Sequence, residues 1–224
     1  NTCAYNCAYL AVDDPKAFDE AMFILLCGTG VGFSVERQYI GKLPDVPEAL
    51  FQSDTTISVH DSKEGWAKAL RQLISLLYAG EVPKWNMSKV RPAGAKLKTF
   101  GGRASGPGPL EDLFNFTCET FEAAKGRKLS SIQAHDLMTK IGEVVVVGGV
   151  RRSAMISLSN LSDDRMRHAK SGDWYVLNPQ RALANNSVAY TEKPDMETFL
   201  REWTSLVESK SGERGIFSRV AAKK

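Results

Sequence analysis

Apolar residues along this chain recur in two patterns, one typical of helices and one typical of strands. Spacings of three and four residues predict helices at 18–26, 66–77, 110–121 and 195–207. Short apolar runs predict strands at 6–10, 56–59, 154–158 and 187–190. No internal repeat or low-complexity linker is visible in the sequence. Helices that alternate with apolar strands predict an α/β domain with parallel strands and flanking helices.

Polar residues mark several of the predicted helix starts. Asp14 and Pro15 suit the N-cap and the first turn of the first helix. Asp61 with Glu64 resembles a capping box ahead of the second helix. These positions predict where the helices begin.

The segment 134–147 is less clear than the other predicted helices. Ser130 and Gln133 form a predicted capping box before it, and Gly148-Gly149 gives a stop after it. The four valines at 144–147 suit a buried strand equally well. Periodicity cannot decide between a helix and a strand over so short a run.

The composition is that of an ordinary globular protein: 224 residues, 43% hydrophobic, 29 basic and 26 acidic side chains. No apolar run approaches the ~20 residues that a membrane helix needs, and no secretory leader opens the chain. We therefore expect a cytoplasmic protein with no membrane partner. Because the chain starts at Asn1 and stops at Lys224 without a helix cap, we expect it to be a piece of a longer protein.

Basic residues gather in the glycine- and proline-rich tract 82–110, which contains no acidic residue. Its cations are Lys84, Lys89, Arg91, Lys96, Lys98 and Arg103. Such a tract suits either an anion site or a solvated surface loop. The net charge of +3 and the presence of only two aromatic residues in the tract argue against a nucleic-acid partner.

The four cysteines, Cys3, Cys7, Cys27 and Cys118, are too few for a disulfide framework and fit free thiols in a reducing compartment. The spacing of Cys3 and Cys7, with only three histidines in the chain, does not match a structural zinc site, so we expect no metal. A single cysteine that opens an apolar strand, as Cys7 does, usually packs in the core.

Two glycine-rich segments are candidate binding loops. The sequence Gly-Thr-Gly-Val-Gly at 28–32 follows a helix rather than a strand, which is the wrong context for a dinucleotide fingerprint. The sequence Gly-Gly-Val-Arg-Arg-Ser at 148–153 places two guanidinium groups on a glycine-hinged loop. Paired arginines bind phosphates, although an exposed salt-bridging loop fits equally well.

The order of these motifs is more specific than any one of them. From Asn1 to about Gly215 the following motifs occur in order: Asn-Cys-Ala-Tyr, Gly-Thr-Gly-Val-Gly-Phe, Arg-Pro-Ala-Gly with Phe-Gly-Gly-Arg-Ala-Ser-Gly-Pro, Gly-Gly-Val-Arg-Arg-Ser-Ala and Asn-Asn-Ser-Val. This order resembles ribonucleotide reductases, in detail the monomeric, adenosylcobalamin-dependent class II enzymes that act on ribonucleoside triphosphates.

The resemblance implies a fold and a division of the chain. The family's fold is a ten-stranded α/β barrel of two parallel five-stranded halves, and this chain resembles the first half with its flanking helices. The segment 41–80 resembles an insertion that builds an effector site within one chain. The tract 82–110 follows it, and 147–158 corresponds to the specificity loop and a strand.

The resemblance also implies roles for particular residues. Cys7 matches one of two cysteines that reduce the substrate ribose, while Cys3 matches no functional position and is expected to be structural. Asn6, Thr29 and Gly30 match substrate-binding positions. Asp14 falls where relatives hold the ribose of a deoxynucleoside triphosphate effector, although helix capping explains it equally well. The specificity loop is matched by Val150, Arg151, Arg152, Ser153 and Ala154.

In such an enzyme a thiol near the 2′ face gives a proton and reducing equivalents, and a second thiol closes a disulfide with it. A third cysteine, as a thiyl radical generated with adenosylcobalamin, abstracts the 3′ hydrogen. A thioredoxin-type reductant restores the thiols. The chain has no Asn-x-Cys-x-Glu finger loop, second reducing cysteine, main cobalamin-binding region or C-terminal thiol pair, and Cys27 and Cys118 fit none of these roles. We expect this chain alone to be inactive.

Two other functions remain open at this stage. The chain also suits the large subunit of an iron-dependent class I reductase, whose radical comes from a partner protein. It also suits a nucleotide-binding regulatory module without catalysis, in which Cys7 is only part of the core. The insertion-like segment and the basic tract favour the cobalamin class.

Overall fold

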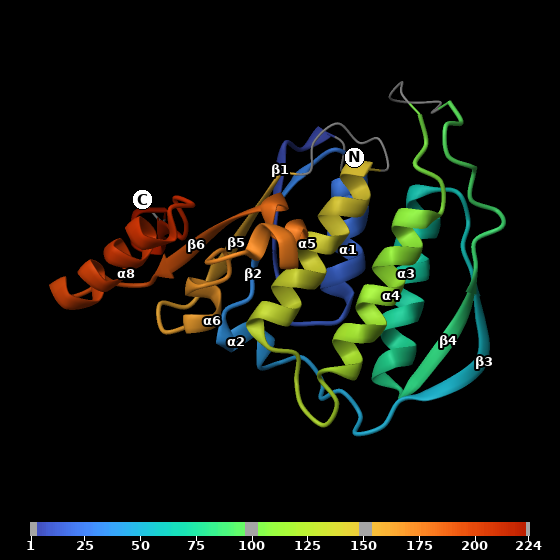
Figure 1. The fold of residues 1–224 in the computed structure, drawn as a ribbon, viewed down its shortest axis with the longest axis horizontal. Helices are drawn as coiled ribbons and strands as arrows, with labels where there is room; N and C mark the ends of the chain where they lie inside the picture. The colour runs from blue at the N-terminus through green and yellow to red at the C-terminus, as the bar shows by residue number, and fades with distance from the viewer. Residues whose placement is uncertain (1–3, 97–102, 148–153, 223–224) are drawn as a thin grey trace.

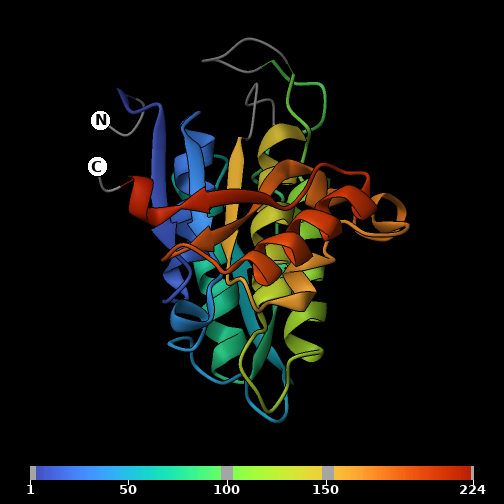
Figure 2. The same cartoon turned by 90° about the vertical axis from the view of Figure 1, so that its left-hand side faces the viewer.

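The computed structural model describes residues 4–96, 103–147 and 154–222, and its centre is a five-stranded sheet in the order β1-β2-β5-β6-β7. Every neighbouring pair of strands is parallel, which confirms the predicted α/β class (Figure 1). In Figure 2 the red strand β7 crosses in front of the blue and gold strands, so the sheet curls strongly. The strands are β1 (Cys7–Ala11), β2 (Gly30–Ser34), β5 (Met155–Ser159), β6 (Ala184–Tyr190) and β7 (Gly215–Ser218).

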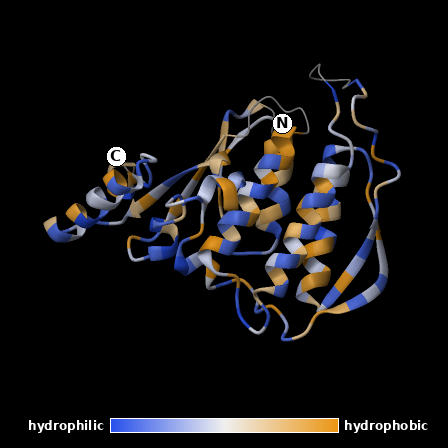
Figure 3. Ribbon diagram, in the orientation of Figure 1, coloured by the Kyte–Doolittle hydropathy of each residue, from blue (hydrophilic) through white to orange (hydrophobic). Residues whose placement is uncertain are grey.

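Four long helices pack together beside this sheet and hold most of the core. They are α1 (Lys16–Leu26), α3 (Lys63–Tyr78), α4 (Gly108–Glu122) and α5 (Ser131–Val147). Helix α1 packs on α3 and α5, and α4 packs on the same two helices, which closes a four-helix group. Apolar segments recur along each of them (Figure 3). Phe18, Phe33, Phe114 and Phe121 are fully buried between these elements.

A second, two-stranded parallel sheet lies on the far side of α3 and α4 (Figure 1). It pairs β3 (Phe51–Ser58) with β4 (Glu81–Asn86). Strand β4 occupies the start of the basic tract 82–110, where the sequence predicted only a loop. Its Trp85 ring packs edge-on against Phe114, with the ring centroids 5.5 Å apart, and this contact anchors the tract to α4.

The elements β1-α1-β2 and β3-α3-β4 form a structural repeat that the sequence did not reveal. Each unit is a parallel strand pair joined by one helix. Asp14 follows the last residue of β1, and Asp61 the last residue of β3, at the same spacing, and each helix begins two residues later. Helices α1 and α3 pack against each other, and the Asp19–Arg71 ion pair (2.6 Å) joins them.

Helix starts were predicted with mixed success. The Ser130–Gln133 capping box is confirmed, since Gln133 Oε1 accepts from Ser130 N at 3.0 Å and Ser130 Oγ accepts from Gln133 N at 3.4 Å. The Asp61 cap is wrong. Ser62 caps α3 instead, because its Oγ accepts from Gly65 N at 2.9 Å. Asp61 binds Arg91 at 2.6 Å, and this ion pair takes its carboxylate away from the helix start.

The valine run at 144–147 is helical, and α5 continues through Val147. The rest of the described chain adds α8 (Met196–Ser209), which was predicted, and several short elements that were not. These are α2 (Arg37–Ile40), α6 (Asp164–Arg167), α7 (Trp174–Leu177), the 3₁₀ helix Pro179–Leu183 and α9 (Arg219–Ala222). Within the described ranges, no helix is both long and apolar enough to cross a membrane.

Candidate functional site

The sheet has one face packed on the helices and one that they leave uncovered. Successive strand residues point to opposite faces. Val31, Phe33 and Met155 lie in the core beneath the four helices. Cys7 and Tyr9 alternate with Leu10, which packs against that core, so they point to the other face, where both are exposed. We call this side of β1, β2, β5 and β6 the uncovered face.

Two glycines leave room beside Cys7 on the uncovered face. In the β1–β2 register, Cys7 lies opposite Gly30 and Tyr9 opposite Gly32. A Cβ on Gly30 would lie 3.3 Å from Ala154 O, which is a tight contact. A Cβ on Gly32 would lie 3.7 Å from Tyr9 Cδ2, an ordinary contact distance. Because the residue opposite Cys7 is a glycine, no β2 side chain lies directly beside the exposed thiol.

Hydrogen bonds bring most of the predicted site residues together at the amino-terminal ends of the strands. Gly30 N donates to Asn6 O at 3.0 Å, and Val31 N donates to Ala154 O at 2.9 Å. The Thr29 hydroxyl donates to Tyr5 O at 2.8 Å, and its residue is only 2% exposed. The predicted site residues Asn6, Cys7, Thr29, Gly30 and Ala154 thus form one cluster, in which the Cys7 thiol is exposed.

Two other predicted sites lie elsewhere. Asp14 follows the carboxyl-terminal end of β1, whereas Cys7 lies at the amino-terminal end, and the strand between them is about 13 Å long. Its Oδ1 accepts from Lys16 N at 2.9 Å, so the carboxylate serves the start of α1. The predicted specificity-loop residues Val150, Arg151, Arg152 and Ser153 lie outside the described residues.

Sequence reasoning missed three polar residues on the uncovered face. Tyr9, Gly32, Ile156 and Asn185 form one row across β1, β2, β5 and β6. Asn186 points to the helices, where its Oδ1 lies 3.0 Å from His135 Nε2. Its neighbours Asn185 and Ser187 therefore point to the uncovered face with Tyr9. The alternation of side chains along each strand can be predicted from the sequence, but the register between neighbouring strands cannot.

A buried ionic network fixes β6 behind this row. His135 is fully buried, and its Nδ1 lies 3.2 Å from Asp136 Oδ1. Arg181 donates two hydrogen bonds of 2.7 Å to the same carboxylate. Burial raises the pKa of Asp136, but the hydrogen bonds from Arg181 and His135 outweigh it, so the pKa lies below its usual value.

A second network joins the far edge of the sheet to β2. Glu36 is buried and accepts hydrogen bonds from Ser34 Oγ at 2.7 Å and from Gln38 Nε2 at 3.0 Å. Arg219, which follows β7, forms an ion pair with Glu36. Partial burial of the Tyr9 ring and the nearby Tyr39 raise the pKa of Tyr9, whereas interactions with Arg219 and Ser34 lower it, and the net pKa is raised.

Cations of the tract 82–110 are partly neutralised. Lys84 binds Asp54 at 3.3 Å and Arg91 binds Asp61 at 2.6 Å. Arg103 Nη1 donates to Gly94 O at 2.9 Å. These three side chains contribute to the local structure rather than to a bare basic surface. Across the part of the chain that the structure describes, no three His, Cys, Asp or Glu side chains are placed to hold a metal ion.

Comparisons with known proteins point to one family. Residues 41–119 match the family described as B12-dependent ribonucleotide reductase, insertion domain. The adenosylcobalamin-dependent ribonucleoside-triphosphate reductase of Euglena gracilis is 32% identical over 194 residues, covering 84% of this chain and 26% of the relative. The protein of the same name from Lacticaseibacillus paracasei is 31% identical and covers 95% of this chain and 32% of the relative.

A solved structure agrees with these relatives. The crystal structure of a B12-dependent (class II) ribonucleotide reductase superposes with a TM-score of 0.70 and 25% sequence identity, covering 84% of this chain and 33% of that one. The chain thus spans about a third or less of the length of the proteins it matches.

Proposed function

This chain belongs to the B12-dependent (class II) ribonucleotide reductases, and on that premise we propose that it is the first half of the catalytic barrel of an adenosylcobalamin-dependent ribonucleoside-triphosphate reductase. The whole enzyme would convert ribonucleoside triphosphates to deoxyribonucleotides. Five parallel strands in one sheet support this, because they match one half of the ten-stranded barrel.

The observation that carries the proposal is the exposed thiol of Cys7 on the uncovered face, beside positions that glycine leaves empty. In the proposed reaction two thiols become one disulfide, the ribose C2′–O bond breaks, and a C2′–H bond replaces it. Cys7 supplies one of these thiols and the proton with which the 2′-hydroxyl leaves as water. Asn6, Thr29 and Gly30 are proposed to position the ribose from the edge of the sheet.

The second reducing thiol must come from outside the described residues. Cys27 caps the end of α1, and Cys118 lies within α4. Burial raises the pKa of Cys118 to about 11, so this thiol stays protonated at neutral pH. We therefore propose that the remainder of the enzyme provides the disulfide partner, the radical cysteine and the thiols that a thioredoxin-type reductant restores.

The cofactor is also proposed to be held by the remainder of the enzyme. Adenosylcobalamin supplies the radical chemistry in this family, and the sequence matches little of the family's cobalamin-binding region. We therefore derive no step through the cofactor. The part played by this chain is to hold the reducing thiol and shape the face on which the ribose lies.

A deoxynucleoside triphosphate effector is proposed to bind at the insertion. The structural repeat suggests which aspartate would hold the effector ribose. Asp14 and Asp61 occupy equivalent places in the two β-α-β units. Asp14 Oδ1 accepts from Lys16 N at the start of α1. At the start of α3 the cap is Ser62, and Asp61 is paired with Arg91. A carboxylate beside a guanidinium suits a ribose hydroxyl next to a phosphate. Of the two, Asp61 is the better candidate, with Arg151 and Arg152 in the specificity loop.

The alternatives fit less well. The insertion match and the named relatives are B12-dependent, which favours class II over the iron-dependent class. A regulatory module with Cys7 as core is disfavoured because the Cys7 thiol is exposed.

The proposal is tested by placing this chain in its full-length enzyme and replacing Cys7. With adenosylcobalamin, a ribonucleoside triphosphate and a dithiol reductant, Cys7→Ser should lower turnover about 10³-fold or more. Cys118→Ser is the matched control and should leave turnover within about twofold. Undiminished turnover of Cys7→Ser, or turnover by the 224-residue chain alone, would contradict the proposal.

A further inference from the structure

The aromatic ring of Tyr9 lies next to the Cys7 thiol on the uncovered face. Both residues belong to β1 and point to the same face two positions apart, so their Cα atoms are about 6.6 Å from each other. Tyr9 is 55% exposed, and Cys7 is exposed as well. A molecule that reaches the thiol therefore comes close to the ring.

Two neighbouring rows of the sheet differ in the size of the side chains that they place here. The row that contains the thiol continues with Gly30 and then Ala154, since a Cβ on Gly30 would lie 3.7 Å from the Ala154 Cβ. The next row contains Tyr9, Gly32 and Ile156, which is 47% exposed. Small side chains around Gly30 thus border a wall formed by Tyr9 and Ile156. We call the space over Gly30, beside the thiol and this wall, the niche.

The Tyr9 side chain is held from the opposite side to the niche. Arg219 and Ser34 interact with it. Arg219 forms an ion pair with Glu36, which is buried and accepts from Ser34 Oγ at 2.7 Å. A ring that is half exposed and already held loses little conformational freedom when a ligand packs on it, so Tyr9 provides a preorganised contact surface.

The charges near the ring favour a sugar over a phosphate at the wall. The guanidinium of Arg219 is the cation beside Tyr9, and Glu36 neutralises it. The wall itself is apolar, because it consists of an aromatic ring and the Ile156 side chain. The C–H groups of a ribose can pack on such a surface, whereas a phosphate would lose hydration there without gaining a partner.

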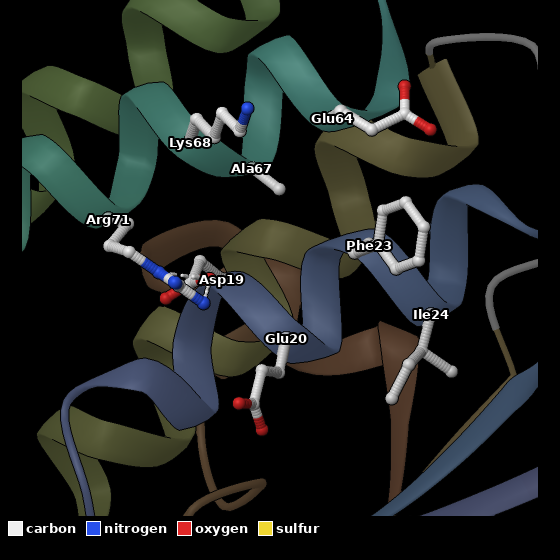
Figure 4. A pocket seen from close by; sticks show the side chains of 8 residues that line it. All are labelled: Asp19, Glu20, Phe23, Ile24, Glu64, Ala67, Lys68 and Arg71. Carbon is white, nitrogen blue, oxygen red and sulfur yellow. Dashed lines mark hydrogen bonds and ion pairs between the residues drawn. The ribbon is translucent and has the colours of Figure 1, made fainter.

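The groove between α1 and α3 is a less suitable place for a nucleotide (Figure 4). Its lining includes the carboxylates of Asp19, Glu20 and Glu64 and the cations of Lys68 and Arg71. Arg71 reaches across to Asp19, at 2.6 Å, so these two charges neutralise each other. Two carboxylates then remain against one cation, which is unfavourable for a triphosphate.

We propose that Tyr9 is a substrate-positioning residue, whose ring forms the wall against which the ribose packs in the niche and so sets the 2′ position beside the Cys7 thiol. This inference rests on the proposed function, in which Cys7 reduces the ribose. It adds a residue that contacts the sugar through an apolar surface to those proposed at the strand ends.

The test measures how well a ribonucleoside triphosphate protects Cys7 from iodoacetamide in the full-length enzyme. ATP, GTP, CTP and UTP are each titrated, and mass spectrometry of the Cys7 peptide gives the concentration for half-protection. Tyr9→Ala should raise that concentration about tenfold, because the ring contact is lost. Tyr9→Phe keeps the ring and should stay within about threefold. Tyr175→Ala removes an exposed ring on α7 and is the matched control, with unchanged protection expected.

Steady-state kinetics give a second readout. Tyr9→Ala should lower kcat/KM about tenfold or more, and Tyr9→Phe should recover most of it, which a general loss of folding would not do. If circular dichroism shows that Tyr9→Ala does not fold, Tyr9→Leu, which keeps apolar bulk but lacks the ring, takes its place and should raise the half-protection concentration at least about threefold.

Two results would overturn the proposal: equal half-protection in Tyr9→Ala, or Tyr9→Leu in its place, and the unaltered enzyme, or no protection of Cys7 by any of the four nucleotides. Protection does not depend on turnover. Turnover that survives Cys7→Ser would reject the proposed function, whereas a failed protection experiment with an inactive Cys7→Ser would reject only the role of Tyr9.

Discussion

The units β1-α1-β2 and β3-α3-β4 share one topology but differ in what their strands carry. On β1 and β2 the uncovered face presents Cys7 and Tyr9 opposite two glycines. On β3 and β4 most exposed side chains are polar, with Phe51 as an exception, and some pair with each other, as in the contact between Ser53 Oγ and Glu81 Oε2 at 2.7 Å. The same β-α-β arrangement thus presents an exposed thiol in one unit and a mainly polar surface in the other. The units differ in their side chains and in their strand pairing, because the β3–β4 register shifts between Gln52 and Thr56, whereas the β1–β2 register is continuous.

The largest expected effect is the loss of unfolding free energy when a buried ion pair is broken, compared with the loss for an exposed pair. Asp136→Asn in the barrel half leaves Arg181 unpaired and largely buried, which should lower the free energy of unfolding by about 3–5 kcal/mol. Asp54→Asn in the insertion removes an exposed pair and should cost at most about 1 kcal/mol. Urea unfolding of both variants measures the difference.

The pH dependence of the same pair gives a second readout. The pKa of Asp136 is lower in the folded chain than in the unfolded one, so its stabilisation is present above the unfolded value of about 3.9. That contribution is lost as the pH falls through the folded pKa. Asp136→Asn should therefore flatten the stability profile below about pH 4, and an unchanged profile would show that the pair does not stabilise the fold.

A change of intermediate size in kcat/KM is expected when the space on the uncovered face near Cys7 is filled. Gly32→Leu adds a side chain to the uncovered face and should lower kcat/KM of the full-length enzyme about 10–100-fold, because it crowds the approach to the thiol. Gly108→Leu, at a position with open space in the four-helix group, is the control and should leave kcat/KM within about twofold. Equal rates for Gly32→Leu and the unaltered enzyme would mean that the substrate does not occupy this face.

The smallest expected effect compares the two equivalent aspartates. Asp61→Asn should weaken deoxynucleoside triphosphate binding to the full-length enzyme about tenfold, because a charged acceptor is lost. Asp14→Asn should leave that affinity unchanged while lowering the stability of α1 by a few tenths of a kcal/mol, since asparagine still caps a helix. Isothermal titration and thermal unfolding measure the two effects, and the reverse pattern would return the effector role to Asp14.

The sequence predicted the long helices and four of the strands, β1, β3, β5 and β6, from their apolar patterns. It did not predict β7, which has four residues, or β4, which carries Pro83 and Lys84 within a loop-like tract. It also did not predict β2, because Gly30 and Gly32 were interpreted as part of a candidate binding loop. The cap on α3 was misassigned by one residue, because Ser62 and Asp61 are both good caps and only the backbone geometry distinguishes them.

For the site, the resemblance brought Cys7, Gly30 and Ala154 to attention, and the structure places them together. Tyr9 and Asn185 lie within two of the motifs that carry the resemblance, but no role was predicted for either residue. Their common face depends on the register of β1, β2, β5 and β6, which is set by helices packed far away in sequence. The Asp136–Arg181 pair joins residues 45 positions apart, and no local pattern encodes it.

The ion pair between Arg219 and Glu36 spans the curved sheet and joins the end of β7 to the end of β2. Arg219 follows the last strand and Glu36 follows the second, and β5 and β6 lie between them. In a flat sheet β2 and β7 would lie about 14 Å apart, so the contact needs the sheet to bend and the long side chain to reach across. The curvature against which a second barrel half would close is therefore held within this chain.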